Sequence, residues 1–148
     1  MTVSRIERES IPMINIYLTG QIAQKRRINT YVRSILTYLM PRLRRDIDIY
    51  INVTKECDDG AYGLCWGDRN EVEIHLSRET QGVKIPLEEM MQTLAHELVH
   101  AKQFIKGDLS PMMRNSKTVY HAKTPYSRQP WELEAYRKEE RLLQTFWL

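Results

Sequence analysis

The chain has 148 residues, of which 42% are hydrophobic and 28% are charged. Gly and Pro are sparse at 6 each, and apolar residues occur along the whole length, which excludes collagen-like, low-complexity and disordered chains. The formal net charge of +3 is too small to indicate nucleic-acid binding by itself. We therefore expect one compact domain that spans residues 1–148.

No targeting segment is recognisable in the sequence. Residues 1–10 are charged and lack the apolar core of a signal peptide, and no apolar run reaches the roughly 18 residues that span a bilayer. We therefore expect a cytoplasmic protein without a membrane segment. The two cysteines, Cys57 and Cys65, do not form a CxxC pattern, so we expect both to be reduced thiols.

The first half of the chain predicts one helix and several strands. Apolar residues recur every three or four positions from about 20 to 40, as expected of a helix packed on a sheet. Residues 47–53 alternate between apolar and polar, which is typical of a strand buried on one face. Residues 61–66 and 71–76 predict the two arms of a hairpin around a polar turn. Residues 13–18 fit either a strand or the lead-in to the helix.

The second half predicts two helices separated by an irregular stretch. Pro86 opens a long helix with acidic residues in its positive first turn, and Gly107 follows its expected end. Residues 108–130 lack periodicity, and loops of that length often serve as lids or binding loops. A last helix is expected from 131 to about 147. The predicted fold is α+β, with a small, mostly antiparallel sheet packed against three helices.

The long helix carries the sequence His96-Glu97-x-x-His100. Residues four apart on a helix project from the same face, so His96 and His100 can present two imidazole nitrogens to one metal ion. A tetrahedral Zn²⁺ accepts that arrangement. Glu97 stands beside the two histidines, where its carboxylate can take a proton from a water that the metal activates. The pattern predicts a site for one Zn²⁺ with Glu97 as the general base.

A catalytic zinc site needs a third protein ligand and one open position. The long helix does not supply that ligand, because Lys106 stands where a His-x-x-Gly-x-x-His continuation would place a histidine. The start of the last helix offers two acidic candidates, Glu132 and Glu134. His121, in the irregular stretch, is a third candidate.

With these motifs the chain resembles the gluzincin group of zinc metallopeptidases, in which a second helix supplies a Glu ligand. The usual Glu-x-x-Ala motif of that helix matches residues 132–135, with Glu132 in the ligand position and Tyr136 where many members have Asp or Asn. Glu134 would then point about 200° around the helix, as a surface or supporting group. The resemblance covers roughly residues 47–143. It implies a zincin-like fold, zinc-dependent peptide-bond hydrolysis, and a protein or peptide substrate that adds a strand beside the hairpin.

A weaker resemblance is to SprT-like proteases that are associated with DNA. That group normally takes its third ligand from a His, a role that only His121 could fill here. Basic residues bracket the first predicted helix and could contact phosphates, but runs of this kind are more often solvated surface. These basic residues are Lys25, Arg26, Arg27, Arg42, Arg44 and Arg45. A further alternative is a non-catalytic metal-binding or interaction protein on a metallopeptidase scaffold.

Other polar side chains could contribute to such a site. Tyr120, His121 and Tyr126 in the irregular stretch could donate a hydrogen bond to the oxyanion that forms during peptide hydrolysis. His75 falls on the polar face of its strand, so we expect it to be exposed or to line the cleft rather than to bind the metal.

Overall fold

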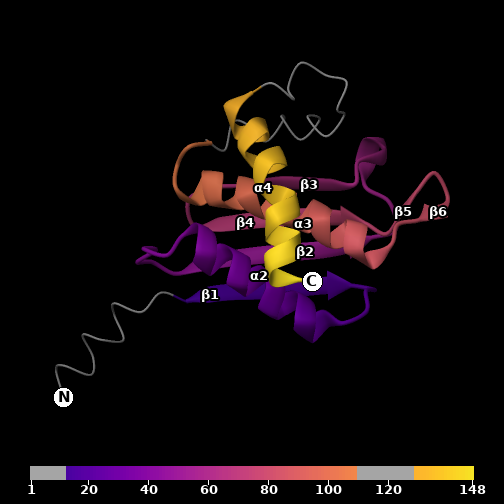
Figure 1. Ribbon diagram of the computed structural model, residues 1–148, viewed down its shortest axis with the longest axis horizontal. Helices are drawn as coiled ribbons and strands as arrows, with labels where there is room; N and C mark the ends of the chain where they lie inside the picture. The colour runs from indigo at the N-terminus through magenta and orange to yellow at the C-terminus, as the bar shows by residue number, and fades with distance from the viewer. Residues whose placement is uncertain (1–12, 110–128) are drawn as a thin grey trace.

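A four-stranded mixed sheet and three α-helices dominate the part of the chain that the computed structural model describes, residues 13–109 and 129–148 (Figure 1). The elements in chain order are β1 (Ile14–Gly20), α2 (Lys25–Leu39), β2 (Ile47–Thr54), the 3₁₀ turn η1 (Asp58–Gly60), β3 (Gly63–Gly67), β4 (Glu71–Ser77), β5 (Glu79–Thr80), β6 (Val83–Lys84), α3 (Leu87–Ile105) and α4 (Pro130–Phe146). The predicted α+β class is confirmed.

The sheet has the strand order β1-β2-β4-β3. Within this four-stranded sheet the pairings β1–β2 and β2–β4 are parallel and the β3–β4 hairpin is antiparallel, and the separate β5–β6 pair is antiparallel as well. The prediction of a mostly antiparallel sheet is therefore wrong. Parallel neighbours need a crossover connection, which α2 supplies between β1 and β2. The second arm of the hairpin pairs with β2 and leaves β3 at the edge of the sheet.

The element boundaries refine the expectations at the start of the chain. Residues 13–18, which fitted either a strand or a lead-in, belong mostly to β1, and the helix begins at Lys25 instead of about 20. Gly20 ends β1 with a φ of 99°, and a Cβ there would lie 2.1 Å from the carbonyl oxygen of Val53. Only glycine fits at that point, where the chain leaves the sheet. The short β5–β6 pair was not predicted.

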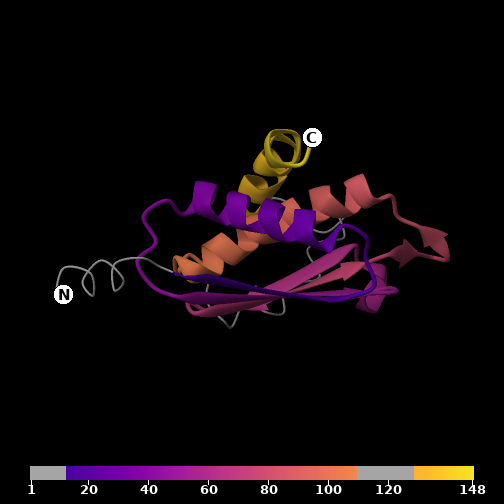
Figure 2. The same cartoon turned by 90° about the horizontal axis from the view of Figure 1, so that it is seen from below.

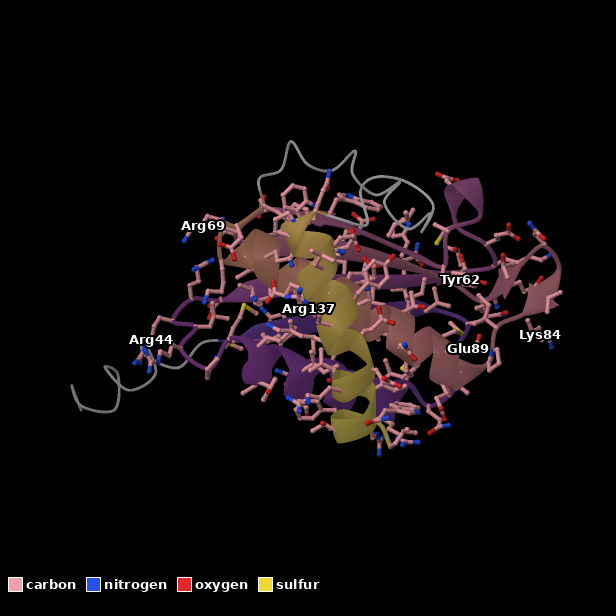
Figure 3. The ribbon with its side chains drawn as sticks, turned by 45° about the horizontal axis from the view of Figure 1, so that its top comes forward. Arg44, Tyr62, Arg69, Lys84, Glu89 and Arg137 are labelled. Carbon is pink, nitrogen blue, oxygen red and sulfur yellow. The ribbon has the colours of Figure 1, made fainter. Side chains whose placement is uncertain are left out.

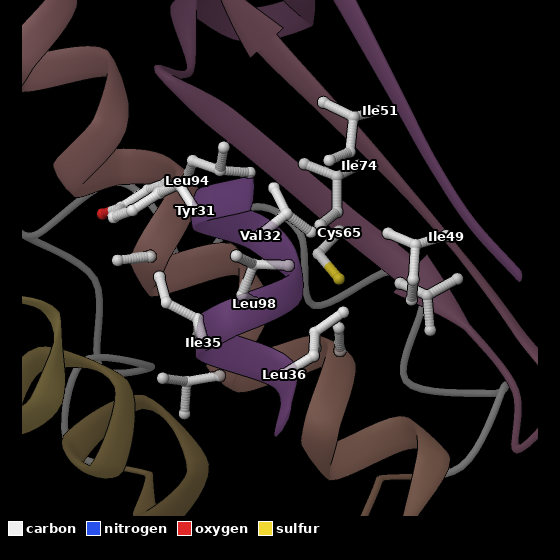
Figure 4. Packing of buried hydrophobic residues seen from close by; sticks show 14 of the residues in the cluster. Tyr31, Val32, Ile35, Leu36, Ile49, Ile51, Cys65, Ile74, Leu94 and Leu98 are labelled. Atoms are coloured by element: carbon white, nitrogen blue, oxygen red, sulfur yellow. The ribbon is translucent and has the colours of Figure 1, made fainter. Parts of the chain in front are cut away.

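The helices form layers on one face of the sheet. Figure 2 shows α2 and α3 against the sheet and α4 outside them, and among the described residues no α-helix covers the opposite face. The alternating residues of β2 point into the core with Ile49 and Ile51 fully buried, as the period-two pattern predicted. They pack against α2 and α3 (Figure 4). Cys57 and Cys65 are buried free thiols, as expected.

Helix α4 is fixed at its C-terminal end by contacts to α2. Trp147 lies edge-on to Tyr31 with 5.3 Å between ring centroids, and the guanidinium of Arg27 lies over the Trp147 ring. Tyr31 also donates a hydrogen bond of 2.8 Å to the carbonyl of Met91 on α3. These contacts connect the three helices and fix the C-terminal end of α4. None of the helices in the described part of the chain has the length and apolarity needed to cross a membrane.

Candidate metal centre

The residues His96, His100 and Glu132 come together between α3 and α4. His96 and His100 lie one turn apart on α3, and Glu132 lies in the first turn of α4. One ligand atom from each of the three lies within 4.8 Å of the other two, and all three residues are buried. They form a group that could hold a metal ion.

A hydrogen bond to Gln103 fixes the tautomer of His100. Gln103 Nε2 donates to the carbonyl of Trp131 at 2.9 Å and to Glu134 Oε1 at 2.8 Å, which sets the orientation of the amide. Its Oε1 therefore faces His100 Nδ1, at 2.7 Å, and accepts a hydrogen bond from it. With the proton on Nδ1, the Nε2 atom of neutral His100 carries a lone pair directed towards Glu132.

Glu139 has the same role for His96. His96 Nδ1 lies 2.8 Å from Glu139 Oε1, and a carboxylate oxygen can only accept. The other oxygen, Oε2, accepts a hydrogen bond of 2.6 Å from Gln92 Nε2, so the Glu139 carboxylate is itself held in place. The Nε2 atom of neutral His96 is then also a lone-pair donor. Such outer partners orient metal-ligating histidines and raise their basicity.

Both Nε2 atoms face one carboxylate oxygen. Glu132 Oε1 lies 2.7 Å from His96 Nε2 and 3.2 Å from His100 Nε2. A lone pair directed at an anionic oxygen is unfavourable, so each contact calls for a proton or a metal cation between the two atoms.

The pKa values of the metal-free site reflect this arrangement. Burial lowers the pKa of His96, but hydrogen bonds to Glu132 and Glu139 outweigh burial and raise it to about 10. Burial favours the neutral acid of Glu132, yet hydrogen bonds from His100 and His96 bring its pKa down to about 2. The carboxylates of Glu132 and Glu139 thus contact the two imidazoles, and the two positive charges of a divalent cation would balance their two negative charges.

One further observation supports the fit of these side chains to a metal ion. Glu132 Oε2 is buried and has no hydrogen-bond partner among the described residues. Buried carboxylate oxygens are normally paired, so such an atom is a typical metal ligand. Two imidazoles and one carboxylate, with other groups holding the far side of each imidazole, are the ligands of a three-residue catalytic zinc site.

Glu97 lies beside this group under the edge strand of the sheet. It is completely buried, and a Cβ at Gly63 of β3 would lie 3.1 Å from Glu97 Oε2 and 2.7 Å from Thr93 Cγ2. The absence of a side chain at Gly63 lets β3 approach α3 closely here. A cavity of about 210 Å³ opens next to Glu97 and His96, with Tyr62 and Tyr136 among its walls.

The alternative third ligands have different positions. Glu134 does not join the three-residue group: its carboxylate accepts hydrogen bonds from Gln103, Lys102 and Lys138. Burial raises the pKa of Glu134, but these hydrogen bonds outweigh it and lower the pKa to about 2. Glu134 therefore supports the amide that orients His100. His121 lies outside the described residues, as do the oxyanion candidates Tyr120 and Tyr126.

Tyr136 contacts a metal-site histidine, whereas His75 lies away from the site. Tyr136 places its ring edge-on to His96, with 4.7 Å between centroids, and the 2.8 Å hydrogen bond of His96 Nδ1 goes to a different residue. Glu139, one turn later, makes that hydrogen bond. His75 lies on the uncovered face of the sheet, partly exposed, with its Nε2 atom 2.7 Å from Glu73 Oε2, and does not join the metal group.

Sequence reasoning missed Glu139, Gln103 and Gly63. A helical signal for the first two was present, because Glu139 lies seven residues after Glu132 and Gln103 seven residues after His96. A separation of seven residues is about two helical turns, so each pair shares a face. No sequence signal marks Gly63, because its role depends on how closely β3 approaches α3.

The basic residues at the two ends of α2 are partly used within the fold. Arg27 donates to the carbonyl of Trp147, and Arg45 donates to the carbonyls of Arg69 and Ile105. A helix of 15 residues is about 22 Å long, so the two groups of basic residues lie at opposite ends. Arg44 and Arg69 lie at the same end of the molecule (Figure 3). These positions do not form one continuous phosphate-binding face.

Comparison of the chain with protein-family models finds no match, and comparison with curated proteins finds none either.

Proposed function

We propose that the chain is a zinc-dependent metallopeptidase that hydrolyses peptide bonds in a protein or peptide substrate. The observation that carries the proposal is the convergence of His96 Nε2 and His100 Nε2 on Glu132, with Glu97 beside them at the cavity. The resemblance to gluzincins, which was drawn from the sequence motifs, implies the same three ligands and the same general base.

Zinc is the metal that this donor set favours. Two neutral imidazoles and one carboxylate are typical of catalytic zinc, whereas Ca²⁺ and Mg²⁺ prefer oxygen ligands alone. Glu139 and Gln103 would hold both imidazoles with Nε2 directed to the ion. When bound, zinc would lower the pKa of a coordinated water to about 7 and polarise the scissile carbonyl.

Glu97 is the proposed general base. Its carboxylate would accept a proton from the attacking water and then deliver that proton to the leaving amine. A purely structural metal site needs no such base, so the presence of Glu97 favours catalysis over the non-catalytic alternative. The burial of Glu97 beneath Gly63 would keep its carboxylate in one position and away from bulk water.

The edge strand β3 is the proposed binding surface for extended substrate. It is the last strand of the sheet and its Gly63 lies directly against Glu97. A peptide that pairs with an exposed sheet edge gains backbone hydrogen bonds irrespective of sequence. A substrate strand on β3 would pass the cavity lined by Tyr62, His96 and Glu97.

Metal analysis and hydrolysis of a fluorescence-quenched casein would test the proposal. We expect about one zinc per chain in the wild type, and we expect His96→Ala to lose most of it because a ligand is removed. Glu97→Gln should retain zinc and lose casein hydrolysis by about 10²-fold or more. The exposed Glu140→Gln on α4 is the matched control and should change neither property.

Two results would contradict the proposal. If the wild-type protein bound no zinc after reconstitution, the metal centre itself would be contradicted. If Glu97→Gln hydrolysed casein at the wild-type rate, the proposed catalytic role of Glu97 would be contradicted. Stoichiometric zinc in a protein that cleaves neither casein nor a peptide library would favour the non-catalytic alternative.

A further inference from the structure

On the face of the sheet opposite α2 and α3, which no α-helix of the described residues covers, polar and aromatic side chains form a row. Strand pairing places Tyr17 opposite Tyr50, Tyr50 opposite Glu73, and Glu73 opposite Trp66. Directly opposed residues point to the same face, so these four side chains form one row across all four strands. Tyr17 and Tyr50 stack with 4.9 Å between centroids, and they are 47% and 40% exposed.

A hollow of about 340 Å³ lies at the Trp66 end of this row. We call it the outer-face hollow, and its side-chain walls are those of Tyr50, Trp66, Asp68, Glu71 and Glu73. It therefore combines two aromatic rings with three carboxylates. Tyr50, Glu71 and Glu73 alternate with the buried residues of their strands and so lie on the face opposite α3, and the hollow shares no lining residue with the cavity at Glu97.

The charge of this face is opposite in sign to that of the whole chain. The chain carries a net charge of +3, yet the three charged residues that line the hollow, Asp68, Glu71 and Glu73, are all acidic, and Asp48 lies beside Glu71 in the register of the sheet. Partial burial together with the charges of Asp48 and Glu71 raises the pKa of Tyr50. Negative charge therefore acts directly on the aromatic part of the row.

Arg45 and Arg69 are directed towards the end of α3. Arg69 lies in the β3–β4 turn, but its Nη1 atom lies 3.0 Å from the Cβ position of Gly107, just after α3. Arg45 donates to the carbonyls of Arg69 and Ile105, again at the end of α3. Neither guanidinium is directed at the carboxylates of the outer-face hollow, whereas His75 Nε2 lies 2.7 Å from Glu73 Oε2 and the His75 ring lies 4.7 Å from the Trp66 ring.

We propose that the outer-face hollow binds a Lys or Arg side chain of a basic polypeptide segment. A cation between the rings of Tyr50 and Trp66 would gain cation–π contacts, and Glu71 and Glu73 would supply charge-assisted hydrogen bonds. The exposed Tyr17–Tyr50 stack would carry the adjoining peptide along the row. The same carboxylates repel phosphate, so this face does not suit nucleic acid. The inference does not depend on the metal site.

Fluorescence anisotropy with a labelled peptide of Gly-Arg-Ser-Lys repeats would test this inference. The full chain is used with Glu97→Gln, so that the probe remains intact. We expect the basic peptide to bind and its acidic Gly-Glu-Ser-Glu counterpart not to bind. Raising the salt from about 50 mM to about 200 mM should weaken binding, because the interaction is between exposed charges.

Substitutions distinguish binding in the outer-face hollow from nonspecific attraction of the peptide to negative charge. Glu71→Gln with Glu73→Gln should lower the affinity at least about fivefold, and Trp66→Leu should do so as well, because it removes one aromatic wall. The control pair, Glu88→Gln with Glu89→Gln, makes the same charge change in the exposed first turn of α3 and should leave the affinity unchanged. Glu71→Gln alone, at an exposed position, provides a variant that is expected to fold normally, as circular dichroism would verify.

The inference is overturned if the basic peptide does not bind, if the acidic peptide binds equally well, or if the control pair weakens binding as much as the hollow variants. Wild-type affinity in Trp66→Leu would likewise overturn the aromatic part of the site. Loss of zinc or of casein hydrolysis would leave it intact, so this inference and the proposed function can fail independently.

Discussion

His96 Nδ1 donates a hydrogen bond of 2.8 Å to Glu139 Oε1, seven residues beyond Glu132 on the same helix. One face of α4 thus contacts both nitrogens of a single imidazole, through Glu132 at Nε2 and through Glu139 at Nδ1. A small rotation of α4 would change both contacts together. The geometry of the metal centre therefore depends on the position and rotation of α4 relative to α3, as well as on the two histidines of α3.

The first prediction concerns Glu139. Glu139→Ala should weaken zinc binding by about 10- to 100-fold, because it removes the group that fixes the tautomer and orientation of His96. Glu139→Gln keeps an oxygen that can accept from Nδ1 and should cost less. Competition with a fluorescent zinc chelator would measure both. The exposed neighbour Glu140→Gln serves as control, and a Glu139→Ala protein with wild-type affinity would contradict the role assigned here.

The second prediction concerns the close approach of β3 to α3. Gly63→Ala would place a Cβ 2.7 Å from Thr93 Cγ2 and 3.1 Å from Glu97 Oε2. We expect a destabilisation of about 1–3 kcal/mol, as for other overpacked sites, together with reduced hydrolysis because Glu97 must move. Chemical unfolding and the casein assay would measure the two effects.

A second substitution makes the Gly63 prediction specific. Thr93→Ser removes the Cγ2 atom that the new Cβ would meet, so Gly63→Ala with Thr93→Ser should recover part of the lost stability. If the double variant were no more stable than Gly63→Ala alone, the clash with Thr93 would not be the cause.

The candidate site could be predicted from the sequence where it depends on local spacing. His96 and His100 share a face because they are four apart on one helix, and this required no knowledge of the tertiary fold. Glu132 followed from the resemblance between residues 132–135 and a known motif, and the structure brings it to the two histidines. Glu139 and Gln103 follow the same helical periodicity but were not predicted, because no motif drew attention to them.

The sheet shows which features sequence patterns do not predict. Alternation in residues 47–53 correctly specified which side chains point into the core, since a strand repeats every two residues. Alternation carries no information about the neighbouring strand. The hairpin was correctly predicted, yet nothing in it indicates that β4 instead of β3 lies beside β2. Parallel pairing therefore emerged only in three dimensions, as did the approach of Gly63 to Glu97.

The third prediction concerns the contact between α2 and α3. Tyr31→Phe removes the hydroxyl that donates to the carbonyl of Met91 and should lower the free energy of unfolding by about 0.5–1.5 kcal/mol. The ring of Tyr31 remains, so its contact with Trp147 should persist. Tyr38→Phe is the matched control, because Tyr38 is 58% exposed on the same helix, and we expect it to be nearly neutral. Equal effects of the two substitutions in urea unfolding would contradict the prediction.

The fourth prediction is a pH dependence of thiol chemistry. Burial raises the pKa of the Cys57 thiol, and burial together with the nearby Glu97 and Glu132 raises the pKa of Cys65 well above its usual value. A raised pKa means less thiolate at every pH below it, and the thiolate is the reactive form. At about pH 8, iodoacetamide should therefore react on the order of tenfold or more slowly with the folded protein than with the unfolded chain. Mass spectrometry of Cys57→Ser and Cys65→Ser would assign each rate, and rapid alkylation of either thiol in the folded protein would contradict its burial.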